Sequence, residues 1–388
     1  MSKQRSMLLF EQAIKSPVTR KVYKYNLKRF LEWSKIKNYD GLLQAPQKQI
    51  QELVEDYVFH LKNTVSANSV PTYYACIELF FTMNDVILNF KKIRKLFPEK
   101  VKMGNGRGYT LQEIQKILTN CNVVRSRALV LLLASSGIRQ GAIPEIKLKH
   151  MSRMENSYCI LIYEDSTEES FIFTTPEATE SIDEYLEKRK KDGEYIDNES
   201  PLFRSTYRLG IQKVIPCTSD SLIKVMMRLI SVIDRKKVGK TDRYDVAMNH
   251  GFRKFYATVI KDVEGISPTM TEKLINHVGI NPLDGNYYKP TKEKMFEAYK
   301  KCISVLTIDD SIRNKIKIEK LENDKTDLKE INSLYEKTIK EKKSIIKEKE
   351  LIERKYRDIA LNTKITDEAI NKRIDELLER KKNTSIKI

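Results

Sequence analysis

Arginine and histidine side chains recur in the middle of this sequence at spacings that could place them around one target. His250 and Arg253 are three residues apart near the start of an expected helix, so they can point at the same group. Arg139 lies upstream, just after an apolar stretch that ends at a glycine, and His277 lies downstream. Arginine binds anionic oxygens through a planar fork and imidazole moves protons near neutral pH. The set therefore indicates chemistry on an anionic substrate.

Each of these residues also has a structural interpretation. Arg139 could cap a helix C-terminus, His250 could cap a helix or lie in a core, and His277 could interact with a helix dipole. An H-x-x-R pattern by itself is common. The functional interpretation depends on all of them occurring together and in one order.

That order, Arg … His-x-x-Arg … His … Tyr, resembles the order of the tyrosine recombinases, the phage-integrase family. The segment SSGIRQGAI is similar to the family's TG-x-R-x-x-E-L box, HGFRKFYAT to H-x-L-R-H-T-F-A-T, and LINHVGI to L-G-H. A Tyr-Tyr-Lys-Pro ending resembles that of archaeal-type integrases. The resemblance covers residues 110 to 307, and the helical N-terminal part is similar to the family's SAM-like core-binding domain.

The resemblance implies roles for these residues at a DNA phosphodiester. Arg139 and Arg253 would stabilise the pentacoordinate transition state through the non-bridging oxygens. A tyrosine would attack and form a 3′-phosphotyrosyl linkage, so that the strand can be resealed without ATP. His250 would assist proton transfer from the tyrosine, and His277 would hold the phosphate by hydrogen bonding.

Two adjacent tyrosines are candidates for the nucleophile. Tyr287 and Tyr288 follow His277 by 10 and 11 residues, and the family's interval is shorter. We predict Tyr288, because the second tyrosine is the better match in Tyr-Tyr-Lys-Pro, and keep Tyr287 as the alternative.

Two positions depart from the family pattern. The family has an acid three residues after the first arginine, where this chain has Ala142, and a lysine on the β-hairpin, where this chain has Glu164. The proton donor to the leaving 5′-oxygen is therefore open. Lys147, Lys149 and Lys240 are the candidates, and we predict Lys240, on the loop before the His250 helix.

Charge and composition favour a nucleic-acid partner. Lys and Arg number 71 against 53 Asp and Glu, a formal charge of +18 that fits a polyanion, although solvated lysine faces would give the same balance. The 5 cysteines are scattered without a C-x-x-C pair and there are only 4 histidines, so we expect neither disulfides nor a metal or other cofactor. No long apolar segment is present, and we expect a cytoplasmic, nucleoid-associated protein without membrane contact.

Helical periodicity and turn signals predict a mainly α protein. We expect a helical core-binding domain at 1–100, a glycine-rich linker at 101–109 and a catalytic domain at 110–308. The catalytic domain should be mostly helical with a small antiparallel sheet, since β-rich runs flank an acidic turn near residue 165. Residues 309–388 lack Gly and Pro and should form a helical or coiled-coil tail.

The tail carries a partial heptad pattern. One position holds isoleucine in most repeats, and its partner position holds two lysines, which weaken the seam. The isoleucine position comprises Ile331, Thr338, Ile345, Ile352 and Ile359. Self-association through this seam and a single solvated helix are both compatible with the pattern.

Together these observations predict a tyrosine-type site-specific DNA recombinase or integrase. The resemblance implies double-stranded DNA as the partner and a homo-tetramer acting on two sites. The alternatives are a catalytically degenerate relative that binds DNA without cutting it, and a coiled-coil architectural DNA-binding protein.

Overall fold

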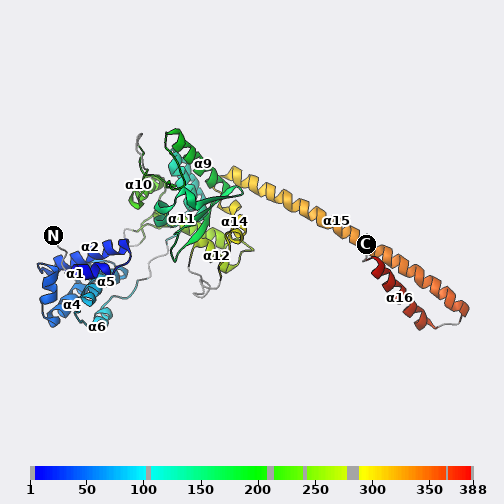
Figure 1. Cartoon of the computed structure of the whole chain (residues 1–388), viewed down its shortest axis with the longest axis horizontal. Coiled ribbons are helices and arrows are strands. Elements are labelled where there is room, and N and C mark those ends of the chain that lie inside the picture. The colour runs from blue at the N-terminus through cyan, green and yellow to red at the C-terminus, as the bar shows by residue number, and fades with distance from the viewer. Residues whose placement is uncertain are drawn as a thin grey trace. The chain divides into compact units, whose positions relative to one another are not determined.

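The computed structural model divides the chain into two compact units, Met1–Asn105 and Gly106–Ile388 (Figure 1). The described residues are 5–101, 106–207, 214–238, 243–277, 288–363 and 366–385. The mainly helical fold class with one small antiparallel sheet is confirmed. The finer division into core-binding domain, linker, catalytic domain and tail stays a prediction.

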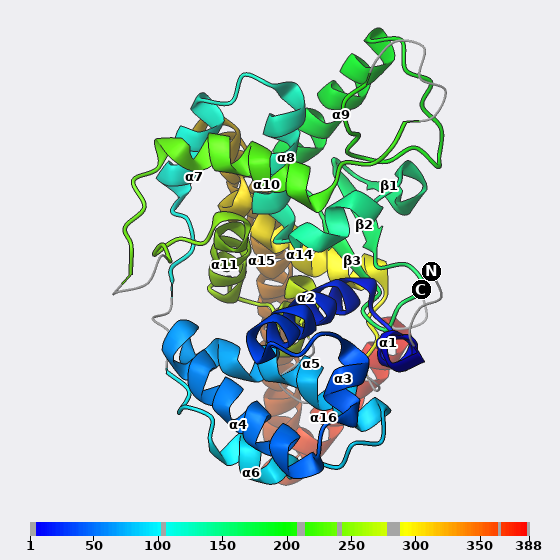
Figure 2. The ribbon, with the colours of Figure 1, turned by 90° about the vertical axis from the view of Figure 1, so that its left-hand side faces the viewer.

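The first unit is a bundle of short helices around α5. Its helices are α1 (Arg5–Gln12), α2 (Pro17–Ser34), α3 (Tyr39–Gln44), α4 (Gln47–Thr64), α5 (Val70–Met83) and α6 (Phe90–Lys95). Helix α5 is the most apolar, and it packs against α1, α2 and α4 (Figure 2). Ser16 caps α2 and Pro17 occupies its first turn, as the sequence predicts. Helices α1 and α3 were not expected, because they are too short for apolar periodicity to show.

The second unit begins with a helix that has a capping box, followed by a helix that is buried along most of its length. Thr110 and Glu113 form a capping box at the start of α7 (Leu111–Thr119). Helix α8 (Val124–Ser136) follows, and a short 3-10 segment, η2 (Gln140–Glu145), comes after it. The remaining helices of the globular part are α9 (Pro176–Lys191), α10 (Ser219–Leu229), α11 (Met248–Lys261), α12 (Pro268–Ile275) and α14 (Lys292–Leu306).

A three-stranded antiparallel sheet lies beside α9, in the order β1-β2-β3. The strands are β1 (Met151–Met154), β2 (Ser157–Ile162) and β3 (Ser170–Phe173). The register pairs Cys159 with Phe173 in the hairpin of β2 and β3. The sequence predicts this hairpin but not β1, which has only 4 residues and no clear alternation.

A glycine ends α8 and directs the backbone into the loop that carries Arg139. Gly137 has φ +58 and closes the helix in the left-handed region, and a side chain there would collide with the ring of Tyr256 on α11. Nearby, the hydroxyl of Tyr299 on α14 donates to the carbonyl of Ser135 (2.8 Å). Helices α8, α11 and α14 therefore meet just before Arg139.

The tail is one long helix with a second helix folded back on it. Helix α15 (Asp310–Thr363) contains 54 residues, and α16 (Asp367–Ser385) packs against its C-terminal part (Figure 1). Ile370 and Ile374 of α16 are buried in this contact. Tyr356 and Ala360 are among the α15 residues on the covered side, whereas Ile359 of the expected seam is half exposed. A helical tail is confirmed, and its pairing with another chain stays a prediction.

Candidate active site

Arg139 lies on the loop that leaves α8 and is open to solvent. Its side chain is 39% exposed, and Nη1 is 3.6 Å from a carboxylate oxygen of Glu168 in the β2–β3 hairpin. The next residue, Gln140, is held on two sides. It accepts a hydrogen bond from Asn249 on α11 and donates to the carbonyl of Ser219 on α10 (2.9 Å). The Arg139 loop is thereby fixed against the helix that carries His250.

Arg253 is buried on α11, with a relative accessibility of 6%. Its guanidinium donates to the main-chain carbonyls of Gly137 (2.7 Å), Ile275 (2.5 Å) and Asn276 (3.3 Å). These three bonds tie the ends of α8 and α12 together without using all of its N–H donors. Burial lowers the pKa of Arg253, and the charge of Arg139 lowers it further. The guanidinium stays charged, and the pair is a concentration of positive charge suited to an anion.

His250 is in the first turn of α11, one helical turn before Arg253. Its pKa is below the usual value, first because of partial burial and then because of the charges of Lys254, Arg253 and His277. The imidazole is therefore neutral at pH 7 and able to accept a proton.

His277 follows the end of α12, where Asn276 adopts a left-handed conformation (φ +58). Its Nδ1 is 3.1 Å from Oε2 of Glu272, whose other oxygen is 2.9 Å from Nζ of Lys261. Because a carboxylate only accepts hydrogen bonds, Nδ1 carries the proton and Nε2 is left for a substrate. The pKa of Glu272 is below its usual value: burial alone would raise it, but Lys261 and His277 outweigh that effect.

Arg253 joins the segments that carry the other residues. It shares α11 with His250, and it donates to the carbonyls of Gly137, two residues before Arg139, and of Asn276, just before His277. Sequence reasoning missed Glu272, which lies on α12 five residues before His277. The available signal was an acid at this spacing before a histidine that follows a helix.

Tyr288 lies just before α14 and is half buried against the core of its unit. Nζ of Lys294 is 5.6 Å from the centre of its ring. The contacts described for Tyr288 are thus with the core and with Lys294, not with the arginines or histidines. Tyr287 and Lys240 lie outside the described residues.

The β2–β3 hairpin has carboxylates at the position where the family pattern has a lysine. Oε2 of Glu164 is 3.1 Å from Nε2 of His150 and 3.4 Å from Nζ of Lys149. The hydrogen bond from His150 lowers the pKa of Glu164, so this carboxyl is ionised at neutral pH. Lys147 is paired with Glu199 (2.6 Å). Ala142 is buried and has no carboxylate, so the acidic partner of Arg139, Glu168, comes from the hairpin instead.

Tyr163 is a second residue that sequence reasoning did not single out. It follows the last residue of β2 in a left-handed conformation (φ +57). Its pKa is raised, mainly by burial and in opposition to the charge of Arg139.

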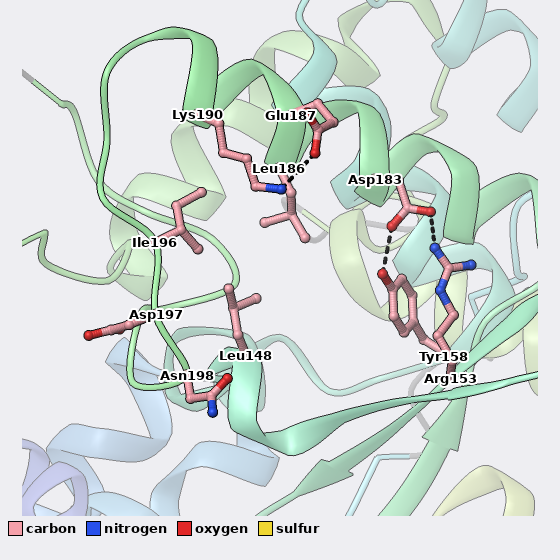
Figure 3. A pocket seen from close by; sticks show the side chains of 10 residues that line it. All are labelled: Leu148, Arg153, Tyr158, Asp183, Leu186, Glu187, Lys190, Ile196, Asp197 and Asn198. Carbon is pink, nitrogen blue, oxygen red and sulfur yellow. Dashed lines mark hydrogen bonds and ion pairs between the residues drawn. The ribbon is translucent and has the colours of Figure 1, made fainter.

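A pocket elsewhere on the second unit contains none of these residues. It has a volume of ≈ 420 Å³ and lies between α9, β1, β2 and the loop around Asn198 (Figure 3). Asp183 there accepts hydrogen bonds from Arg153 and from the hydroxyl of Tyr158 (2.6 Å), so the polar groups on that side of the pocket are paired with one another.

Metal binding needs clustered ligand side chains, and a membrane span needs a long apolar helix. No group of three or more His, Cys, Asp or Glu side chains that could hold a metal ion occurs in the described ranges. Across the same parts of the chain, no helix combines the length and apolar character needed to cross a bilayer.

Comparison with solved structures identifies the fold. The XerH site-specific recombinase bound to difH substrate, in a pre-cleavage complex, is similar with a TM-score of 0.51 and 15% identity, covering 70% of this chain and 77% of that one. A Tn1549 transposon integrase in complex with a circular intermediate DNA has a TM-score of 0.50 and 12% identity, covering 77% and 99%. These similarities show a common fold.

Comparison of sequences adds a curated relative, although no family model matches the chain. The tyrosine recombinase XerA of Pyrococcus horikoshii is 22% identical over 294 residues, which cover 76% of this chain and 90% of the relative. The chain is thus similar in sequence to a tyrosine recombinase and has the fold of site-specific recombinases. At the two positions where it departs from the pattern of that family, it has Ala142 and Glu164.

Proposed function

We propose that this chain is a site-specific recombinase that cuts and rejoins double-stranded DNA through a 3′-phosphotyrosyl intermediate. The observation that carries the proposal is the pairing of buried Arg253 with Arg139, beside a neutral His250. Two guanidiniums with spare N–H donors suit the doubly charged, pentacoordinate phosphorus of the transition state. The DNA-bound recombinases of the same fold support DNA as the partner.

In this proposal each side chain has one task. Arg139 and Arg253 hold the non-bridging oxygens, and His250 accepts the proton of the attacking tyrosine, for which its neutral state suits it. His277, with its Nδ1 held by Glu272, forms a hydrogen bond to the phosphate through Nε2. Tyr288 is the nucleophile, and Tyr287 remains the alternative.

The way in which copies of the chain assemble on DNA is also a proposal. Recombination exchanges strands between two DNA sites, and we propose a homo-tetramer on two sites, as the family resemblance implies. The exposed apolar residues of α15 favour additional self-association through the tail, among them Leu328 and Ile331. A DNA-acting enzyme of this kind would work at the nucleoid.

A nicked suicide substrate tests the cleavage proposal. When the strand beyond the cut dissociates, the covalent complex accumulates and its shift on a denaturing gel measures cleavage. Tyr288→Phe should abolish the adduct and leave DNA affinity nearly unchanged, whereas Tyr287→Phe should retain it. If only Tyr287→Phe loses the adduct, the nucleophile is Tyr287. If the parent protein binds DNA and forms no adduct, the chain is the degenerate relative.

A further inference from the structure

Two side-chain amides connect the loop of Arg139 to the helix of His250. Gln140 comes directly after Arg139, and Asn249 comes directly before His250. Nδ2 of Asn249 donates a hydrogen bond to Oε1 of Gln140, across 109 positions of the sequence. One bond between side chains therefore joins the immediate neighbours of two residues of the proposed site.

A neighbouring hydrogen bond decides which way the two amides face. Nε2 of Gln140 donates to the main-chain carbonyl of Ser219 (2.9 Å), the first residue of α10, and a carbonyl only accepts. The Gln140 amide must therefore turn its oxygen toward Asn249, and Asn249 must present its NH2 group. The start of α10 is itself held by the capping box of Thr218 and Ser221, so Gln140 is bonded to a fixed part of the fold.

The two segments that this bond joins each have alanine where a polar side chain would be expected to hold the backbone. Helix α11 has Ala247 at its N-cap, so no capping side chain bonds the amides of its first turn. On the loop, Ala142 lies three residues after the first arginine, where the family pattern has an acid. The bond between Gln140 and Asn249 therefore takes over the task of holding the loop against the start of α11.

Stability alone does not explain the amide at position 249, because Asn249 keeps an unpaired acceptor. Its Oδ1 is buried and has no hydrogen-bond partner in the part of the chain that the structure describes. A buried acceptor without a partner destabilises the folded state, which offsets what the bond to Gln140 contributes. The value of Asn249 therefore lies in what its NH2 group holds in place rather than in the free energy of unfolding.

We propose that Gln140 and Asn249 are positioning residues that hold Arg139 and His250 at a fixed separation on one scissile phosphate, an inference that rests on the proposed function. In that function Arg139 binds a non-bridging oxygen while His250 takes the proton of the attacking tyrosine, so both must reach the same phosphorus centre. A displacement of about 1 Å between such groups can slow a reaction about 100-fold. The two amides do not touch the reacting atoms, and each acts through the residue beside it.

Single-turnover cleavage of the nicked suicide substrate at saturating protein, DNA affinity and thermal unfolding together test this role. Asn249→Ala and Gln140→Ala should each slow cleavage by about 10- to 100-fold, with DNA affinity within about twofold of the parent and little change in the unfolding temperature. The double variant should be no slower than the slower single variant, because both changes break the same bond. Gln140→Asn combined with Asn249→Gln restores two facing amides and should recover most of the lost rate.

Gln115→Ala is the matched control, since it removes a glutamine amide that donates to a main-chain carbonyl in the same unit, that of Ile308 (3.0 Å). It should cleave at the parent rate. Parent-like cleavage by both alanine variants, losses that multiply in the double variant, no recovery in the exchanged pair, or a loss that follows a lowered unfolding temperature would each overturn the inference. An adduct formed by the parent protein preserves the proposed function in all of these cases, whereas a parent protein that forms no adduct overturns both.

Discussion

The two arginines of the site differ in how the protein holds them. Arg253 is buried and fastened to the carbonyls of Gly137, Ile275 and Asn276, so it supports the packing of three helices as well as facing the site. Arg139 is 39% exposed, and its Nη1 is 3.6 Å from a carboxylate oxygen of Glu168 in the hairpin. The core therefore holds the Arg253 side chain in place, whereas the exposed Arg139 side chain can move to meet a substrate.

This difference predicts different consequences for substitution. Arg139→Ala and Arg253→Ala should each reduce single-turnover cleavage by at least about 100-fold, a typical loss for one transition-state donor. Arg253→Ala should also destabilise the fold by about 1–3 kcal/mol, because it leaves buried carbonyls without partners. Thermal unfolding and suicide-substrate cleavage measure the two effects. An Arg139→Ala protein that cleaves normally would contradict the proposed site.

The neutral state of His250 predicts a pH profile. Because its pKa lies below the usual value, the base form predominates at neutral pH. Cleavage should be flat from about pH 8 down to about pH 6.5, and should fall at lower pH as the imidazole takes up a proton. His250→Gln should be slow and should lack that fall, with His60→Gln as the control outside the site. A fall beginning above pH 7 in the parent would contradict the assignment.

The sequence was sufficient for the residues that carry a motif and insufficient for those that do not. Arg139, His250 and Arg253 could be found because glycine, helix periodicity and spacing mark their surroundings. Glu272 was missed although it is only five residues from His277, because an acid at that spacing belongs to no motif. Tyr163 was missed because its position depends on one backbone angle. A left-handed residue after a strand has no composition signal unless it is glycine or asparagine.

At the scale of elements, α2 shows which partners the cations of a basic helix face have. In the sequence, Arg20, Lys24 and Lys28 are compatible with a DNA-facing surface and equally with a solvated one. In the structure Arg20 donates to the carbonyl of Ile14 (2.7 Å), and Lys24 is 2.9 Å from a carboxylate oxygen of the buried Glu11. Both cations are used within their own unit, so replacing them should alter stability as well as the salt dependence of DNA binding.

The acidic hairpin loop is the second element with a testable effect. Glu168 stands beside Arg139, where a phosphate oxygen would bind in the proposed mechanism, so DNA has to displace it. Glu168→Gln should raise the affinity for DNA by up to about fivefold, since an exposed ion pair contributes about 0–1 kcal/mol. Titration of a labelled site at fixed salt measures this, with Asp165→Asn as the control of equal charge change. Equal gains in both variants would indicate a general charge effect instead.

At the scale of the whole molecule, the start of α15 is fixed to the globular part of its unit. A carboxylate oxygen of Glu177 on α9 accepts from the amide of Ile308 (2.8 Å), and Gln115 on α7 donates to the carbonyl of the same residue (3.0 Å). Arg313 donates back to the carbonyls of Thr307 and Ile308 (2.9 Å each). The first turn of α15 is thus part of the folded unit, and a truncation that removes it would disturb the core.

Beyond that turn, most side chains of α15 are exposed in the part of the chain that the structure describes. At about 1.5 Å per residue, its 54 residues extend over about 80 Å. Apolar side chains on it are strongly exposed: Leu321 67%, Leu328 60%, Ile331 58% and Tyr335 68%. Helices of this composition gain most of their stability by packing an apolar face. A second copy, which carries the same face, is the partner that the proposed assembly brings near.

A truncation after Lys317, which keeps Arg313 and its hydrogen bonds, tests the tail. It should cleave a single site at the parent rate and should weaken assembly of the two-site complex, measured by gel shift and by sedimentation of the full chain. Leu328→Lys with Ile331→Lys should reproduce the assembly defect. Thr326→Lys with Ser333→Lys adds the same charge on the opposite side of the helix, at about 100° per residue, and should not. If the full chain sediments as a monomer and the two-site complex survives truncation, the tail does not self-associate, and its apolar residues serve another contact.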